Sequence, residues 1–256
     1  MIGVQALHVK TGSNWVPAPA EFILRGDEVH VSFVSLAQSP KVESELVELL
    51  SHDERLRAER FYFERDRRRF IVARALLRKM LAGYLSANPD SLVFSYGVAG
   101  KPALAGRWSG ALDFNVSHSA DGVLYAIATG RGVGVDLEYI RPLHDMAEIA
   151  ARVLSRGEQE IFSNASPAAC ERMFYEFWTR KEAFIKAMGY GLSFPVQQLD
   201  VTLPFGQPSR LVTFCDTGSG KRNWTLCSLA PEPFYAAALV VEGEASEIRL
   251  WQWPGT

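Results

Sequence analysis

Residues 129–138 read Thr129-Gly130-Arg131-Gly132-Val133-Gly134-Val135-Asp136-Leu137-Glu138. After the glycine-containing turn the side chains alternate, which predicts a strand with Val135 and Leu137 on one face and Asp136 and Glu138 on the other. Residues two apart on a strand lie about 6.5 Å from each other along the backbone, so the two carboxylates can converge on one ion. Oxygen ligands without His or Cys nearby favour Mg²⁺. An exposed polar face on an edge strand would give the same pattern.

The turn also divides the chain, because the same order of elements is read on both sides of it. The first part, residues 1–131, begins with an extended, Pro-rich lead-in at residues 1–28. The patterns then predict two helices, one that begins at Ser51 or Asp53 and runs through a basic stretch and one at Arg69–Leu85. They predict strands at Val29–Val34, Leu92–Ser95, Asp113–Val116 and Val123–Ala128.

The second part, residues 132–256, repeats that order. The patterns predict a strand at Gly132–Tyr139, helices at Met146–Leu154, Glu158–Phe162 and Glu171–Met188, and strands at Leu199–Leu203, Leu211–Cys215, Trp224–Leu229, Phe234–Val241 and Ile248–Trp251. We therefore expect an α+β fold made of two similar halves packed against each other.

The helix predicted at Glu171–Met188 carries charges beside its apolar face. Lys181 projects from the middle of the arc that Phe184 and its apolar neighbours form on a helical wheel. Glu182 and Lys186 line the edge of that arc, one turn apart. Charges in such positions are costly unless they are paired or take part in chemistry. We predict that Lys181 pairs with a carboxylate or with carbonyl groups and holds the helix in place.

The composition is that of a globular protein, with 256 residues of which 48% are hydrophobic and 22% charged. No apolar stretch reaches 18 residues and the N-terminus lacks a signal-peptide pattern, so we expect a cytoplasmic protein that does not enter a membrane. Cys170, Cys215 and Cys227 lack C-x-x-C spacing, which indicates buried, reduced thiols rather than disulfides or zinc ligands. Five isolated histidines give no ligand pair for a transition metal.

The formal net charge of −2 is unevenly distributed. Between Ser51 and Met80 there are ten Lys or Arg against five Asp or Glu, a local net charge of +5, so the remainder carries −7. A basic patch on an acidic body suits a compact anionic ligand better than a long polyanion. A solvated arginine face on two helices would have the same composition.

Two further segments carry polar residues whose role the residues alone leave open. His118, in Ser117-His118-Ser119, shares a strand face with Phe114 and Val116, as a half-buried structural histidine would. Gly100-Lys101-Pro102 reads as a turn with an exposed lysine, which alone is a weak signal for phosphate binding.

Taken together and in this order, four segments resemble the 4′-phosphopantetheinyl transferases of the surfactin-synthetase-activating (Sfp) type: Gly100–Pro102, Phe114–Ser119, Gly134–Glu138 and Trp178–Lys186. The resemblance runs from about Val29 to Val241. It implies a pseudo-dimer of two α+β halves with the active site at their interface.

The resemblance also implies roles for single residues. Three carboxylates match the magnesium ligands of the family: Asp136, Glu138 and Glu182. The residues that match its coenzyme A site are Arg57, Arg69, Gly100, Lys101, Pro102, Ser117, His118 and Lys186. Among these, Arg57, Arg69 and His118 are expected at the 3′-phosphate, because guanidinium groups bind phosphate bidentately. Glu54 stands where some relatives carry a lysine for that phosphate, which leaves Arg57, Arg60 or Arg69 to supply the contact.

The implied reaction transfers 4′-phosphopantetheine from coenzyme A to a serine hydroxyl of an apo acyl or peptidyl carrier protein and releases adenosine 3′,5′-bisphosphate. Its catalytic residues would be Glu182, Lys186 and His118. Glu182 is the candidate general base, with His118 or a water as alternatives. Lys186 would stabilise charge on the departing oxygen.

The expected partners are coenzyme A and an acidic carrier protein that binds at Met146–Phe162 and Gly189–Leu192 of the second half, although those glycines equally indicate a helix C-cap. We expect a monomer that binds no nucleic acid. The alternatives are an inactive homologue that only binds carrier proteins, and a nucleic-acid-binding protein acting through the arginines of residues 51–80.

Overall fold

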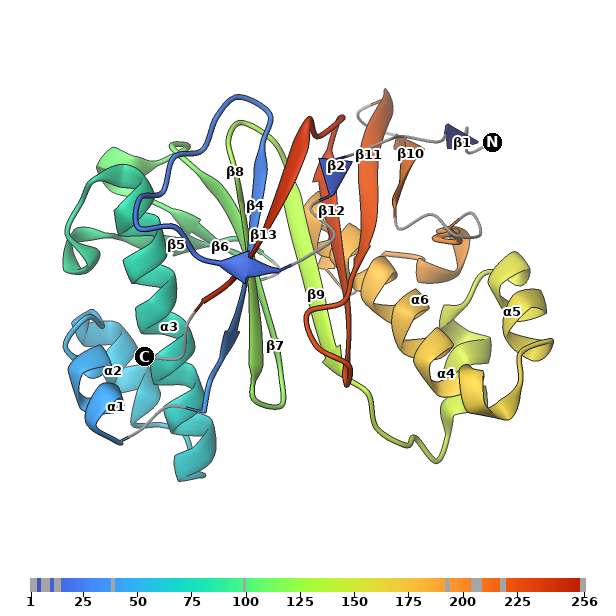
Figure 1. Ribbon diagram of the computed structural model, residues 1–256, viewed down its shortest axis with the longest axis horizontal. Helices are drawn as coiled ribbons and strands as arrows, with labels where there is room; N and C mark the ends of the chain where they lie inside the picture. The colour runs from blue at the N-terminus through green and yellow to red at the C-terminus, as the bar shows by residue number, and fades with distance from the viewer. Residues whose placement is uncertain are drawn as a thin grey trace.

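The computed structural model of the chain describes residues 4–5, 10–11, 15–37, 40–98, 100–191, 194–203, 209–216 and 220–253. Two main sheets pack against each other through a shared apolar core, and helices cover the outer face of each (Figure 1). A second core lies between the first sheet and its helices, and a third lies between the second sheet and its helices. This layered arrangement of helices and mostly antiparallel strands is the predicted α+β class.

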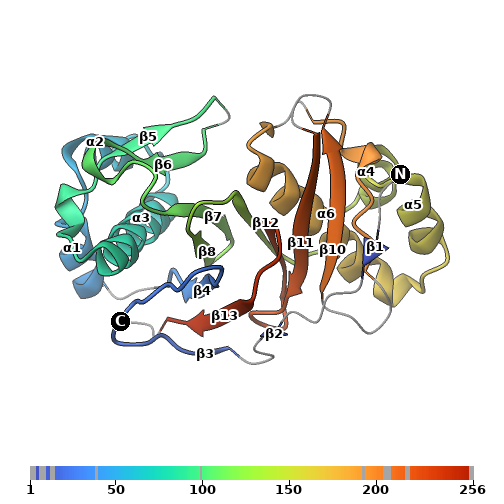
Figure 2. The same cartoon turned by 90° about the horizontal axis from the view of Figure 1, so that it is seen from above.

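The first sheet has the strand order β2-β13-β4-β8-β7, with β3 also paired to β13. Its strands are β2 (Lys10–Thr11), β3 (Val16–Pro17), β4 (Val29–Ser35), β7 (Asp113–Ser119), β8 (Gly122–Ala128) and β13 (Glu247–Gln252). The helices on this side are α1 (Pro40–Val47), α2 (His52–Ala58) and α3 (Glu64–Leu85). A separate hairpin of β5 (Phe94–Tyr96) and β6 (Pro102–Leu104) lies next to these helices (Figure 2).

The second sheet has the order β1-β10-β11-β12-β9. Its strands are β1 (Val4–Gln5), β10 (Ser209–Asp216), β11 (Gly220–Leu229), β12 (Tyr235–Glu242) and β9 (Val133–Tyr139). The helices on this side are α4 (Met146–Val153), α5 (Arg156–Ser163) and α6 (Pro167–Met188). Helix α6 contacts β9 and β12, so its apolar face is the one that covers the sheet.

Each end of the chain adds a strand to the sheet of the other part. Strand β1 pairs with β10, whereas β13 pairs in parallel with β4, and Figure 1 shows the two termini on opposite sides of the molecule. The predicted boundary between residues 131 and 132 falls in the turn between β8 and β9. The short strands at the start of the chain lie within the lead-in that the sequence indicated.

One predicted strand is wrong. Residues 199–203 form no strand, although Leu199 and Val201 are buried. Side chains satisfy the backbone here instead of a neighbouring strand, since Val201 N donates to Oε1 of Glu158 at 2.8 Å and the carbonyl of Leu199 accepts from Lys181. The alternation of apolar residues therefore reflects an extended segment that packs on α6.

Several boundaries differ from the prediction. Helix α6 begins at Pro167, four residues earlier than predicted, because Ser166 takes the N-cap position and proline suits the first helical position. Helix α3 begins at Glu64 rather than Arg69, since its first turn is polar and gives no apolar period. Strand β5 starts at Phe94 instead of Leu92, and α1 was not predicted. Ser51 is the N-cap of α2, as expected, and its N–H donates to Glu54.

Among the described residues, no helix combines the length and apolar composition that a membrane span requires. Cys170 is partly exposed and Cys227 is buried, and neither is part of a disulfide. The side chain of Cys215 lies outside what the structure describes.

Candidate active site

The close approach of helix α6 to strand β9 brings the charged residues of the two elements together. Gly134 makes this approach possible, because a Cβ at that position would lie 2.1 Å from the carbonyl oxygen of Ala183 and 2.4 Å from the amide of Ala187. Any larger residue would force the helix outward. With Gly134 in place, Glu182 and Lys186 of α6 line the same cavity as Asp136 and Glu138 of β9.

Side chains of β7 join the two sheets beside that cavity. The oxygens of Asn115, Ser117 and Ser119 accept the backbone N–H groups of Val135, Leu137 and Tyr139 at 2.9, 3.3 and 3.0 Å. These β7 residues alternate in sequence, so they share one face of the strand. Strands β7 and β9 belong to different sheets, and in these three hydrogen bonds the backbone of β9 donates to side chains of β7.

The two serines of this row also hold the carboxylates. Ser117 Oγ donates to Oδ1 of Asp136 at 2.9 Å, and Ser119 Oγ donates to Oε2 of Glu138 at 2.8 Å. Ser117 was predicted only as a coenzyme A contact, and Ser119 was not predicted at all. The signal for Ser119 was its two-residue spacing from Ser117, which places both hydroxyls on one side of β7.

Asp136 is a buried carboxylate that also contacts Lys186. Lys186 Nζ lies 2.6 Å from Oδ1 of Asp136 and 3.0 Å from Oγ of Ser117. The second oxygen, Oδ2, is buried and has no hydrogen-bond partner. Burial raises the pKa of Asp136, which the ammonium of Lys186 partly offsets. An ionised oxygen without a partner in the interior is a candidate ligand for a cation.

The pKa values of the other two carboxylates are raised as well. For Glu138 and for Glu182 the main cause is burial, and the negative charge of Asp136 adds to it. Three acids that repel one another in one cavity favour binding of a cation. Within the described residues, however, no three His, Cys, Asp or Glu side chains are grouped closely enough to hold a metal ion. The donor chemistry fits Mg²⁺, and the assignment of ligands stays a prediction.

The cavity between β7, β9 and α6 has a volume of about 290 Å³. It is lined by Val116, Ser117, His118, Asp136, Glu138, Trp178, Glu182 and Lys186. Six of the predicted site residues are therefore brought together here. Trp178, which the sequence analysis left without a role at the site, also lines the cavity together with Glu138.

A second cavity, of about 450 Å³, adjoins the first at Val116 and His118. Its walls include Arg57, Arg69, Gly100, Pro102 and aromatic residues of α3 and the preceding loop. A third, of about 300 Å³, shares Glu182 and Lys186 with the first and reaches the end of α6. The residues predicted to bind coenzyme A thus line three adjoining cavities.

His118 does not have the half-buried structural position that its strand face indicated. Phe114 is buried, Val116 is half-buried and His118 is exposed, because this face of β7 runs out of the core toward the turn. Desolvation against the cavity wall lowers the pKa of His118, and the ammonium of Lys186 lowers it further. A neutral imidazole beside two cavities can contact a ligand.

Lys101 is half-buried and lines the third cavity, but its ammonium is bound to backbone groups. Its Nζ donates to the carbonyl of Val133 at 2.8 Å and to that of Lys186 at 3.0 Å, and burial lowers its pKa to about 8. The expectation of an exposed lysine is therefore wrong. Gly100, with φ of 76°, supplies the left-handed residue that this turn requires.

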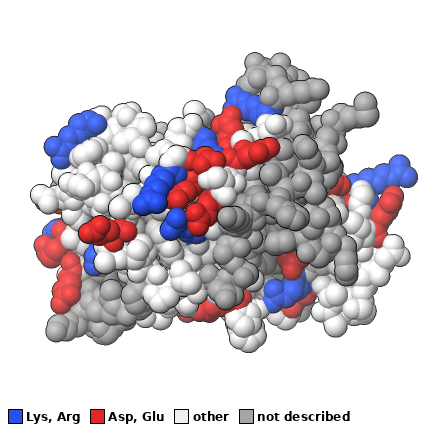
Figure 3. Space-filling model, turned by 45° about the horizontal axis from the view of Figure 1, so that its top comes forward, with Lys and Arg blue, Asp and Glu red and all other residues white. Residues whose placement is uncertain are grey.

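Most cations of residues 51–80 are already paired. Seven of the ten make ion pairs: Arg55, Arg65, Arg67, Arg68, Arg69, Arg74 and Arg78. Arg69 binds Asp121 at 2.8 Å, whereas Arg57 lies over the ring of Phe70. On the face drawn in Figure 3, basic and acidic side chains likewise lie against each other. Such pairing within residues 51–80 reduces the positive charge that this stretch presents to a polyanion.

Glu54 occupies the centre of one such cluster. It is buried, with Arg74 Nε 2.5 Å from Oε1 and Arg78 Nε 2.6 Å from Oε2. The two guanidinium groups keep the pKa of Glu54 below its usual value in spite of burial. Glu54 therefore holds α2 against α3, and it is no phosphate ligand.

Lys181 has the structural role predicted for it. Its Nζ is fully buried, lies 2.8 Å from Oε2 of Glu158 and also donates to the carbonyls of Val196 and Leu199. It therefore faces away from the cavity and ties α6 to α5 and to the segment that follows.

Of the predicted carrier surface, α4 and α5 cover residues 146–153 and 156–163. Gly189 is the left-handed C-cap of α6, its N–H donating to Ile185, so the C-cap interpretation is confirmed for it. Leu192 lies outside the described residues.

Comparison with known proteins gives the family. A profile described as "4'-phosphopantetheinyl transferase superfamily" matches residues 132–240, and one described as "4'-phosphopantetheinyl transferase, N-terminal" matches residues 38–130. The 4′-phosphopantetheinyl transferase HetI of a Nostoc species is 35% identical over 94% of this chain and 98% of its own. A putative 4′-phosphopantetheinyl transferase of a Synechocystis species is 36% identical over 70% of this chain and 72% of its own.

Two further matches are a bacterial transferase and a solved structure. The 4′-phosphopantetheinyl transferase AcpT of Escherichia coli is 34% identical over 67% of this chain and 80% of its own. A solved holo-(acyl-carrier-protein) synthase of Bacillus anthracis, in complex with CoA, aligns with 43% of this chain and 94% of its own, with 19% identity and a TM-score of 0.32.

The two profiles and the near full-length relative agree with one another. They confirm the resemblance drawn from the four segments and the predicted α+β fold class. The chain belongs to the 4′-phosphopantetheinyl transferase superfamily and is an enzyme of that class.

Proposed function

We propose that the cavity between β7, β9 and α6 is the active site and that it lies at the interface of the two halves. There the enzyme would transfer 4′-phosphopantetheine from coenzyme A to a serine of an apo acyl or peptidyl carrier protein. The observation that carries this proposal is the meeting of Asp136, Glu138, Glu182 and Lys186 in one cavity beside a larger one that Arg57 lines.

Three carboxylates, Asp136, Glu138 and Glu182, would hold Mg²⁺. The unpartnered Oδ2 of Asp136 and the raised pKa values of all three support this assignment. When bound, Mg²⁺ supplies positive charge to a pyrophosphate and helps to orient it. The same protein groups, without such a cation, would repel the pyrophosphate of coenzyme A.

Coenzyme A would lie along the adjoining cavities. Arg57, Arg69 and His118 would contact its 3′-phosphate, and the turn at Gly100–Pro102 its adenine. Arg69 is bound to Asp121 on the exposed surface, where such a pair contributes little, so exchange of that partner for a phosphate is inexpensive. Arg57 makes no ion pair among the described contacts, so it can bind a phosphate without first giving up a carboxylate.

The reaction itself needs a base and a stabilised leaving group. The serine oxygen of the carrier forms a bond to the β-phosphorus, and the bond from that phosphorus to the bridging oxygen breaks. The raised pKa of Glu182 makes it a stronger base than an ordinary glutamate, and Glu182 would take the serine proton. Lys186 would stabilise the negative charge on the bridging oxygen, which leaves with adenosine 3′,5′-bisphosphate.

A direct experiment tests the proposal. The protein is incubated with coenzyme A, Mg²⁺ and apo carrier proteins of the fatty-acid, polyketide and peptide-synthetase types, and the mass of each carrier is followed. A phosphopantetheine adduct on a carrier serine is expected, together with release of adenosine 3′,5′-bisphosphate. Absence of the adduct from every carrier, with the carrier still bound, would favour the inactive homologue instead.

A further inference from the structure

We propose that Lys101 is a positioning residue, which fixes the last turns of α6 against β9 and so sets where the ammonium of Lys186 lies. Lys101 Nζ donates to the backbone carbonyls of Val133 and of Lys186 itself, at 2.8 and 3.0 Å. The inference rests on the proposed role of Lys186 at the leaving group. It differs from the direct coenzyme A contact that the family resemblance implies for Lys101.

The two carbonyl oxygens explain why the half-buried ammonium of Lys101 is stable in this position. Helix α6 ends at Met188, so the carbonyl of Lys186 is one of the last four, which have no partner within the helix. A cation at the C-terminus of a helix is also favoured by the helix dipole. Lys101, coming from the turn before β6, supplies both the missing donor and the charge.

Lys101 thereby connects three segments that surround the cavities. The turn at residues 97–101 is closed by hydrogen bonds of Gly97 N to the carbonyl of Lys101 and of Gly100 N to that of Gly97. From this turn the side chain reaches β9 at Val133 and α6 at Lys186. The same turn of α6 then places Lys186 Nζ 2.6 Å from Oδ1 of Asp136.

The two roles make opposite kinetic predictions. A lysine that binds a phosphate of coenzyme A contributes to substrate affinity, and its removal raises KM. A lysine that acts through Lys186 affects a group that works in the transition state, and its removal lowers kcat while KM changes little. Misplacing such a group by about 1 Å lowers the rate by about 100-fold.

The test compares K101M, K186M and the double variant, with coenzyme A and with 3′-dephospho-coenzyme A as substrates. We expect K101M to lose about 10- to 100-fold in kcat with either substrate and to change KM by less than about twofold. The double variant should be no slower than K186M by more than about twofold, because both changes remove the same contribution. K79M, at an exposed lysine of α3 that lines none of the three cavities described, is the matched control.

K101Q keeps the proposal testable if K101M does not fold. The amide of the introduced glutamine can donate to the two carbonyls without carrying a charge. If Lys101 positions α6, the kcat of K101Q should therefore be higher than that of K101M. If Lys101 instead binds a phosphate, K101Q should show a raised KM for coenzyme A, because the positive charge is lost. A KM increase that disappears with 3′-dephospho-coenzyme A, or additive losses in the double variant, would overturn the inference. Wild-type activity of K186M alone would instead reject the proposed active site.

Discussion

Lys186 Nζ lies 2.6 Å from Oδ1 of Asp136, and this contact joins the helix and the strand that carry the proposed chemistry. Asp136 is buried, whereas Lys186 is partly exposed. Lys186 satisfies one carboxylate oxygen and leaves Oδ2 without a partner. Asp136 is thus the site residue at which a bound cation and Lys186 would share one carboxylate.

The variant D136N should lose transfer activity while staying folded. The amide oxygen of the introduced asparagine can still accept from Lys186 and Ser117, so only the charged character of these hydrogen bonds is lost, and the free energy of unfolding at pH 7 should fall by about 1–3 kcal/mol. The rate of phosphopantetheine transfer should fall by about 1000-fold, because several kcal/mol of charge stabilisation is removed. Carrier mass spectrometry and urea denaturation measure the two quantities. D90N, at an exposed acid that lines none of the three cavities, serves as the control. More than a tenth of wild-type activity in D136N would reject Asp136 as a ligand.

The variant S119A should weaken the response to Mg²⁺. Ser119 Oγ donates to Glu138 at 2.8 Å and accepts from Tyr139 N at 3.0 Å, so it fixes the orientation of a proposed ligand. Loss of such a support typically costs at least about 10-fold in metal affinity. The Mg²⁺ concentration for half-maximal activity should rise accordingly, and calorimetric Mn²⁺ binding should weaken in parallel. S91A, at a surface serine that donates to the carbonyl of Asn88, should change neither, and an unchanged Mn²⁺ affinity in S119A would contradict the prediction.

Local patterns in the sequence were sufficient for the strand of Asp136 and Glu138 and for the helix of Glu182 and Lys186. Both depend on periods of two or 3.6 residues, which the chain carries in itself. The pattern also identified Lys181 as a residue that needs a partner.

What the sequence could not give is which groups far apart in the chain would meet. Glu158 was placed in a helix, but nothing in its surroundings indicated that Lys181 would be its partner. Lys101 has the sequence context of an exposed turn, yet it caps a helix 85 residues away. The segment at Leu199 alternates like a strand, although side chains satisfy its backbone. In each case tertiary contacts override a local pattern.

The variant E54K should destabilise the protein and should not create a phosphate contact. Glu54 is buried between Arg74 and Arg78, so a lysine there leaves three cations together without an acid. Breaking a buried pair of this kind costs about 3–5 kcal/mol. Urea denaturation should show that loss, and KM for coenzyme A should not improve. E59K, which changes an exposed acid at the end of α2, is the control. A stable E54K with tighter coenzyme A binding would show that Glu54 adjoins the phosphate site.

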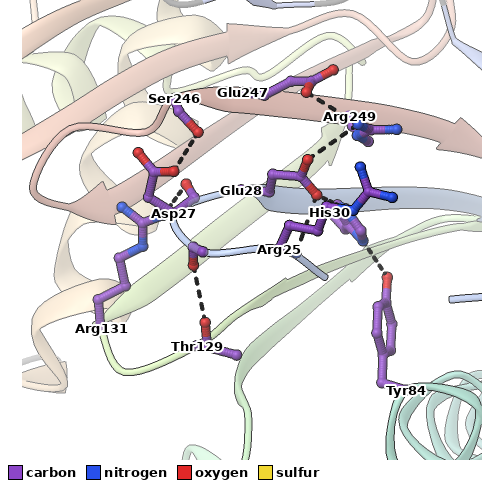
Figure 4. A network of polar contacts seen from close by, with 11 residues as sticks. Arg25, Asp27, Glu28, His30, Tyr84, Thr129, Arg131, Ser246, Glu247 and Arg249 are labelled. Carbon is purple, nitrogen blue, oxygen red and sulfur yellow. Dashed lines mark hydrogen bonds and ion pairs between the residues drawn. The ribbon is translucent and has the colours of Figure 1, made fainter. Parts of the chain in front are cut away.

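The stability of the protein should decrease between neutral and mildly acidic pH because of His30. This histidine is buried between Tyr84, 2.8 Å from Nδ1, and Glu28, 3.3 Å from Nε2 (Figure 4). Burial lowers the pKa of His30 to about 4, whereas the unfolded chain takes up the proton near pH 6.5. The unfolded state therefore binds more protons between these values. The free energy of unfolding should fall as the pH drops through this window, by about 3 kcal/mol in all.

Urea denaturation at several pH values between 7 and 4 measures this dependence. H30Q should be less stable at pH 7, because Gln replaces a ring that satisfies both neighbours, but its pH dependence should be flatter than that of the wild type. H52Q, at an exposed histidine in α2, should keep the wild-type dependence. Equal slopes for H30Q and the wild type would show that other groups cause the acid sensitivity.

The variant K181M should unfold more easily without altering the chemistry of the folded enzyme. Methionine leaves Glu158 charged, fully buried and without its counter-ion, and it leaves the carbonyls of Val196 and Leu199 without a donor. Removing one partner of such a pair costs about 3–5 kcal/mol. A double-mutant cycle with E158Q separates the pair from the other contacts, because the second change removes the buried charge. The two losses should fall short of additivity by about 2 kcal/mol.

At a temperature where K181M is folded, its kcat should equal that of the wild type, since Lys181 faces away from the cavity. A reduced kcat with unchanged stability would instead assign Lys181 to the active site beside Glu182.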